Sequence, residues 1–119
     1  MSLDETCAVV RQVGAALAKA HDLGVVHRDI EPDNIFLLEG DREMFVKVLD
    51  FGIALDLAEG VSRLTSEGAV VGTPHFMAPE QMMGSEHVGP AADVWALGVV
   101  AYRCLTQRLP YEEESVAAM

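Results

Sequence analysis

The sequence has few cysteines. Only two occur in 119 residues, Cys7 and Cys104, and they lie far apart without a CxxC pattern. Neither a disulfide framework nor a zinc site is therefore indicated. Unpaired thiols are typical of a reducing compartment, so we expect the chain to be cytoplasmic.

Basic residues are also scarce. Eight Lys and Arg stand against 19 Asp and Glu, which gives a formal net charge of −11. Nucleic acid and anionic membrane surfaces repel such a chain, so neither is expected as a partner. The acidic clusters at 39–43 and 112–114 are interpreted as solvated surface.

Long apolar stretches are missing. The longest run, VWALGVVAY, is about half the length that a membrane-spanning helix needs. The N-terminal MSLDETCAVV lacks the basic flank and apolar core of a signal peptide. We therefore expect a soluble segment without membrane contact.

Helical periodicity dominates the start of the chain. A chain of this length is one small domain or part of a larger one. Apolar residues recur at helical spacing from Val9 to Ala20, which predicts a helix. Asp4 or Thr6 is expected to cap it, and Gly24 to end it.

The rest of the chain mixes strand and helix signals. Two β-like runs occupy 34–38 and 44–51, separated by a turn-rich stretch. Residues 52–79 show little periodicity, and a loop of that length inside a compact domain is usually functional. A second helix is expected from Ala91. It is apolar nearly all round, which predicts that it is buried. The expected fold class is α+β.

Three motifs then follow in a fixed order: HRDIEPDN (27–34), DFG (50–52) and GTPHFMAPE (72–80), with DVWALG (93–98) after them. Together they resemble the eukaryotic-like protein kinase family, in its bacterial serine/threonine form. The resemblance covers nearly the whole chain. It implies a kinase-like fold in which residues 1–119 form part of the mainly helical C-terminal lobe, with the catalytic loop, activation segment and buried helix.

Other parts of that family's domain have no counterpart in the sequence. No GxGxxG loop, VAIK-like lysine strand or partner glutamate is found, and the last helices of the C-terminal lobe are missing. We therefore expect a partial kinase domain, inactive on its own.

The resemblance implies a role for each motif residue. Asp29 is the catalytic carboxylate that faces the incoming hydroxyl, and Asn34 and Asp50 are the Mg²⁺ ligands. ATP is the expected phosphoryl donor and a protein Ser or Thr the acceptor. Phe36 is expected below the adenine, and Thr73 beside Asp29. His27 and Phe51 are expected to pack beneath the site.

The activation segment has its own expected residues. Arg28 resembles the arginine that holds a phosphorylated segment, because arginine pairs bidentately with phosphate. The candidate phosphate acceptors are Ser62, Thr65 and Ser66.

One residue departs from the family. Glu31 stands where serine/threonine kinases carry a lysine that meets the transferring phosphate, so a positive charge is replaced by a negative one. The main hypothesis is a serine/threonine kinase segment impaired by Glu31. Two alternatives are a pseudokinase-like binding module and a non-functional gene fragment.

Overall fold

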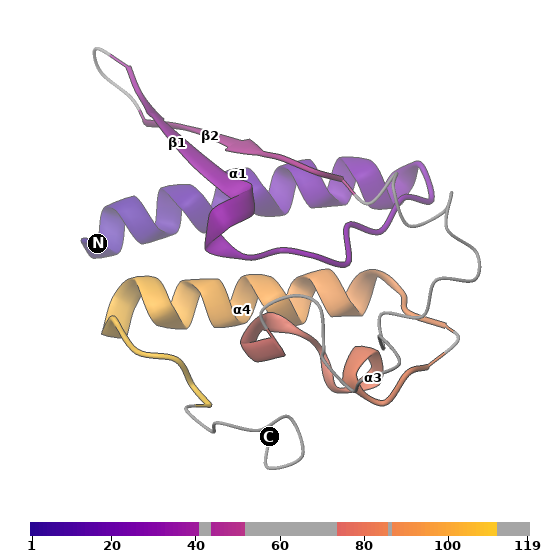
Figure 1. Ribbon diagram of the computed structural model, residues 1–119. Coiled ribbons are helices and arrows are strands. Elements are labelled where there is room, and N and C mark those ends of the chain that lie inside the picture. The colour runs from indigo at the N-terminus through magenta and orange to yellow at the C-terminus, as the bar shows by residue number, and fades with distance from the viewer. Residues whose placement is uncertain (41–43, 52–73, 86, 112–119) are drawn as a thin grey trace.

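Figure 1 shows a computed structural model of the chain, which describes residues 1–40, 44–51, 74–85 and 87–111. The long helices are α1 (Leu3–Asp22) and α4 (Pro90–Thr106). Among the described residues, the chain between them forms the strands β1 (Ile35–Glu39) and β2 (Met44–Val48) and three short helices: η1 (Pro32–Asn34), η2 (Pro74–Phe76) and α3 (Pro79–Met82). The chain is therefore α+β, as expected.

Helix α1 begins earlier than expected. Ser2 Oγ accepts a hydrogen bond from the Glu5 N–H at 3.2 Å, and the Ser2 N–H donates to Glu5 Oε2 at 2.7 Å. This reciprocal capping box makes Ser2 the N-cap, so the expectation of Asp4 or Thr6 was wrong. The Thr6 hydroxyl is instead buried and donates to the Ser2 carbonyl at 2.9 Å. Gly24, just past the helix, has φ 75°, which suits a helix stop.

The core lies between α1 and α4, which run in opposite directions side by side (Figure 1). Helical spacing brings one apolar stripe of each helix to the interface. The α4 helix is not buried all round, however: Val94 is 64% exposed and Leu105 52% exposed. Within the described residues only α1 and η2 pack extensively on α4, and these two side chains lie outside that packing. The buried apolar cluster consists of Val9, Val13, Leu17, Ile30, Phe76, Ala96, Val99 and Val100.

The hairpin of β1 and β2 packs against α1, chiefly through β2 (Figure 1). Its strands are antiparallel, with Ile35 opposite Val48 and Leu37 opposite Val46. Gln12 of α1 holds the hairpin against the helix, because its side chain donates to the Met44 carbonyl and accepts from the Val46 N–H.

Strand β2 is shorter than the expected 44–51, since Asp50 has φ 54° and so leaves the extended conformation. Within the described residues no helix is long and apolar enough to cross a membrane.

Candidate active site

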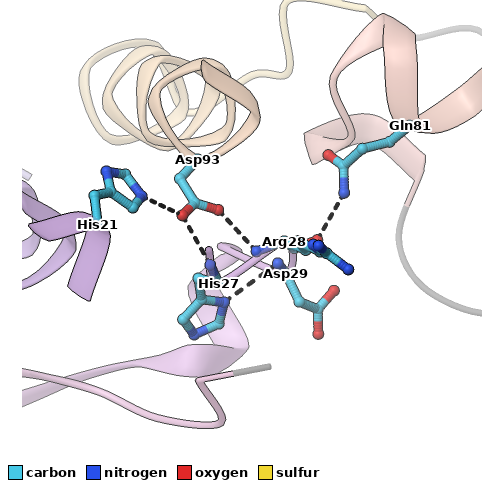
Figure 2. Close-up of polar contacts among 6 residues, drawn as sticks. All are labelled: His21, His27, Arg28, Asp29, Gln81 and Asp93. Carbon is cyan, nitrogen blue, oxygen red and sulfur yellow. Dashed lines mark hydrogen bonds and ion pairs between the residues drawn. The ribbon is translucent and has the colours of Figure 1, made fainter. Parts of the chain in front are cut away.

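A buried carboxylate anchors the loop that joins α1 to β1. Asp93, in the first turn of α4, is 1% exposed. Its Oδ2 accepts from the His27 N–H at 2.9 Å and from His21 Nε2 at 2.7 Å, and its Oδ1 accepts from the Arg28 N–H at 2.8 Å (Figure 2). A buried charge is tolerated only when it is well paired, and three donors satisfy this one. They also fix the loop backbone relative to α4.

The His27 ring connects the same loop to the end of β2. His27 is fully buried, and its Nε2 lies 2.8 Å from the Leu49 carbonyl, which can only accept. Its Nδ1 lies 3.2 Å from the Asp29 backbone nitrogen, which can only donate. The contacts therefore select the neutral ring with its proton on Nε2. The ring packs edge-on against the Phe51 ring, with 4.8 Å between the ring centroids. This is the packing role expected for both residues.

Arg28 carries backbone strain at the centre of the site. Its φ is 66°, in the left-handed region that costs a non-glycine residue about 1–2 kcal/mol. Both backbone polar groups of Arg28 are held: the N–H by Asp93 and the carbonyl by Gln81 Nε2 at 2.8 Å (Figure 2). Its side-chain Nε is buried and, within the described residues, has no hydrogen-bond partner. The strained conformation persists because its surroundings over-determine it.

Asp29 follows directly and is half-buried. Asn34 Nδ2 donates to the Asp29 carbonyl at 2.8 Å and to Asp29 Oδ2 at 3.1 Å. Within the described residues Asp29 Oδ1 has no hydrogen bond, so it can accept a proton. Figure 2 shows this carboxylate directed away from the Asp93 cluster. Asp29 is thus a fixed carboxylate with one available oxygen.

The two residues expected as Mg²⁺ ligands, Asn34 and Asp50, lie near the end of the hairpin. The Leu49 N–H donates to the Asn34 carbonyl at 2.9 Å, which places Asn34 across from Leu49 and next to the exposed Asp50. Because the Asn34 amide nitrogen faces Asp29, its oxygen remains available. In the described parts of the chain no group of three or more His, Cys, Asp or Glu could hold a metal ion. Two hard oxygens still suit Mg²⁺, which is usually bound by few protein ligands together with substrate phosphates and water.

The remaining expected residues are placed less centrally or lie outside the described residues. Glu31 is the residue before η1 and is half-buried. Its backbone carbonyl accepts from the Asn34 N–H at 3.0 Å, whereas its side chain makes no hydrogen bond or ion pair within the described residues. Phe36 lies on β1 and is 51% exposed, open to contact rather than part of the core. Four expected residues fall outside the described residues: Ser62, Thr65, Ser66 and Thr73.

Sequence reasoning missed Asp93 and Gln81 as site residues. Asp93 was named only as part of the DVWALG motif, and its ion pair with His21 was not predicted from the sequence. The available signal was an aspartate within an otherwise apolar helix, where an unpaired charge is rare. For Gln81 the sequence held no comparable signal.

Comparisons with known proteins identify the family of the chain. Residues 1–119 match the protein kinase domain family. The chain is 53% identical over 111 residues to serine/threonine-protein kinase Pkn1 of Myxococcus xanthus, covering 92% of this chain and 16% of that relative. It is 42% identical over 112 residues to serine/threonine-protein kinase PknE of Mycobacterium tuberculosis, covering 94% of this chain and 19% of that relative.

A third relative, serine/threonine-protein kinase pkn3 of Myxococcus xanthus, is 46% identical over 110 residues, which is 90% of this chain and 20% of that relative. The chain therefore spans at most a fifth of the length of these relatives. The matched family, the bacterial relatives and the geometry around Asp29 agree, and the chain belongs to the serine/threonine branch of the protein kinase family.

Proposed function

We propose that this chain supplies the catalytic loop of a kinase that transfers the γ-phosphoryl group of ATP to Ser or Thr hydroxyls of protein substrates. The observation that carries the proposal is the fixed Asp29 carboxylate. Its backbone is tied to His27, one of its oxygens is bonded by Asn34, and the other is available. Phosphoryl transfer needs this arrangement, because most of its catalysis is positioning and charge stabilisation.

The proposed step is an in-line displacement. The substrate hydroxyl oxygen bonds to the γ-phosphorus of ATP, and its proton passes to Asp29 Oδ1. The bond between the γ-phosphorus and the bridging oxygen breaks, and ADP leaves with that electron pair. Asn34 keeps the carboxylate oriented throughout, because it bonds the carboxylate and the carbonyl of the same residue.

Asn34 and Asp50 are the residues that would hold Mg²⁺, which supplies positive charge to the phosphates. Asp50 adopts its left-handed backbone without help from glycine, and Asp tolerates that region better than most residues. Phe36 would contribute apolar contact to the adenine, since it is exposed on the strand that starts beside Asn34. The acceptors Ser62, Thr65 and Ser66, with Arg28 as their phosphate partner, and the contribution of Thr73 remain proposals.

Glu31 favours one alternative, a binding module without catalysis. A carboxylate near the transferring phosphate repels it, and no cation pairs with Glu31 within the described residues. Two observations support catalysis instead. Asp29 and Asn34 keep a geometry that a binding module does not need, and Asp50 directly follows Leu49, whose N–H bonds the Asn34 carbonyl. The proposal is therefore a kinase whose rate Glu31 lowers.

The cellular setting is part of the proposal. Cys7 and Cys104 are both free, which supports a reducing cytoplasm. Protein substrates and ATP are the proposed partners, and the strong negative charge supports the expectation that nucleic acid is not one.

The test uses a chimera in which this chain replaces the 111 residues that it matches in Pkn1. Phosphoryl transfer to a generic Ser/Thr substrate is measured with labelled ATP. We expect activity that Asp29→Asn reduces by a factor of about 10²–10⁴, the usual contribution of a positioned base. A chimera whose rate does not respond to Asp29→Asn, even with Glu31→Lys in place, would refute the proposal.

A further inference from the structure

The peptide group that joins Arg28 to Asp29 is held on both sides. Its N–H, from Asp29, donates to His27 Nδ1 at 3.2 Å, and its carbonyl, from Arg28, accepts from Gln81 Nε2 at 2.8 Å. The first partner comes from the loop itself. The second comes from α3, and Gln81 lies 53 residues further along the chain (Figure 2).

The Gln81 side chain is itself fixed in orientation. Its Oε1 accepts from the Ala78 N–H at 3.1 Å, which leaves only its amide nitrogen to face the Arg28 carbonyl. Ala78 is buried, and the neighbouring Phe76 and Met77 line a cavity of about 10 Å³ together with Arg28, Asp29, Ile30 and Glu31. The segment 74–82 and the catalytic loop are therefore in close contact, and Gln81 is the hydrogen-bonded link between them.

We propose that Gln81 is a positioning residue that couples the placement of residues 74–82 to the orientation of the Asp29 carboxylate. The proposal rests on the proposed function, in which Asp29 accepts the proton of the substrate hydroxyl.

The physical reason is the strain at Arg28. Since its φ of 66° is unfavourable, the peptide group after it stays in place only while its contacts hold. Removing the Gln81 donor leaves the Arg28 carbonyl without that partner and allows the peptide to rotate. Rotation of this peptide moves Asp29 directly, and a displacement of about 1 Å can reduce a catalytic rate by about a hundredfold.

The chain offers a matched control. Gln12 makes the same pair of bonds elsewhere, donating to the Met44 carbonyl at 2.9 Å and accepting from the Val46 N–H at 3.0 Å. Gln81→Met and Gln12→Met therefore each remove two side-chain hydrogen bonds from a residue that keeps its length. A merely structural role for Gln81 predicts that both variants lose stability and rate alike.

The variants are measured in the Pkn1 chimera with Glu31→Lys in every protein, so that the rate is high enough to follow. Gln81→Met should lower kcat by about ten- to a hundredfold, with KM for ATP within about twofold, whereas Gln12→Met should leave kcat within about twofold. Hydrogen exchange at the amides of 27–31 should become faster in Gln81→Met only. Equal effects of the two variants on kcat and exchange would overturn the proposal.

A second variant keeps the test decisive if Gln81→Met folds poorly. Gln81→Glu retains the acceptor for Ala78 but directs a carboxylate oxygen at the Arg28 carbonyl, so its kcat should be low near pH 8. A protonated Glu side chain can donate again. The ratio of its kcat to that of the parent should therefore rise as the pH falls from about 8 to about 5.5, because proximity to a carbonyl favours the neutral carboxyl. A ratio that does not change with pH would count against Gln81.

Failure of the Gln81 proposal can be distinguished from failure of the proposed function. Asp29→Asn in the same chimera reports on the chemistry alone, and hydrogen exchange reports on the Gln81 link without any activity. If Asp29→Asn changes nothing, the proposed function fails whatever the exchange shows. If Asp29→Asn abolishes the rate while Gln81→Met and Gln12→Met behave alike, only the Gln81 proposal fails.

Discussion

Replacing Glu31 by lysine is the change with the largest predicted effect on rate. Glu31 lies two residues after Asp29 and directly before η1, and within the described residues no partner neutralises its charge. Glu31→Lys removes a negative charge and adds a positive one beside the proposed position of the transferring phosphoryl group. We expect kcat to rise with little change in ATP affinity, since the repulsion acts mainly where charge develops in the transition state.

The magnitude follows from Coulomb's law. Two unit charges about 4 Å apart interact by about 4 kcal/mol at an effective dielectric constant of about 20. Glu31 is half-buried, so solvent screens part of this, and about 2–4 kcal/mol is a reasonable difference between the two charges. That free energy corresponds to an increase of about 30- to 1000-fold in kcat.

The assay is initial-rate kinetics of the Pkn1 chimera at saturating Mg-ATP with a generic Ser/Thr substrate. The control is Asp33→Lys, which makes the same charge change at an exposed position of the same loop and should alter kcat only a fewfold. Asp29→Asn combined with Glu31→Lys should abolish the gain. A rate for Glu31→Lys within a fewfold of the parent, or equal to that of Asp33→Lys, would refute the reasoning.

Three further changes test the structure directly. Asp93→Ala should lower the free energy of unfolding, measured in urea, by about 3–5 kcal/mol, because it leaves the His27 and Arg28 N–H groups buried and unpaired. The control Asp22→Ala, at an exposed position, should lower it by less than about 0.5 kcal/mol. Asn also tolerates the left-handed backbone of Asp50, so Asp50→Asn should not lower the melting temperature. The variant should raise the Mg²⁺ concentration that gives half the maximal rate. An unchanged Mg²⁺ dependence would contradict the ligand role. Hydrogen bonding to Ser2, chiefly from its backbone N–H, holds the pKa of Glu5 below its usual range. Ionised Glu5 therefore stabilises α1 fully at a pH above its unfolded-state pKa, and this stabilisation is lost as the pH falls through the folded-state pKa. The melting-temperature difference between the parent and Glu5→Gln should therefore shrink in acid, and a constant difference would argue against it.

The sequence predicted those features of the fold that depend on neighbouring residues. Periodicity located both long helices, and turn residues located the hairpin, because these signals act over a few positions. The N-cap was wrong because Ser2, Asp4 and Thr6 are all acceptable caps locally, and Thr6 is withdrawn into the core by its bond to the Ser2 carbonyl. The expected burial of α4 failed on one face only, since its apolar composition does not show which face meets α1.

In the candidate site, too, the sequence predicted what depends on neighbouring residues and missed what depends on distant ones. Asp29, Asn34 and Asp50 could be named as candidates because each lies within a short motif, HRDIEPDN or DFG. The residues that hold the loop around Asp29 could not be named, because their contacts are long-range. Asp93 lies 66 residues from His27 along the chain, and Gln81 lies 53 residues from Arg28. Which carboxylate or amide reaches a given peptide group depends on how α3 and α4 pack, and that information is spread over the whole chain.

The supports of the loop also explain how Glu31 can change the chemistry without disturbing the structure. Asp93, His27 and Gln81 hold the loop through its backbone at residues 27–29, and the Glu31 side chain takes part in none of these contacts. A reversal of charge at position 31 therefore costs the fold little, and the geometry around Asp29 is the same whether the phosphate is attracted or repelled. The geometry around Asp29 favours a slowed kinase over a binding module, and kinetics can distinguish the two. The two differ in the response of kcat to Glu31→Lys, because only a slowed kinase has a transition state from which the repulsion can be removed.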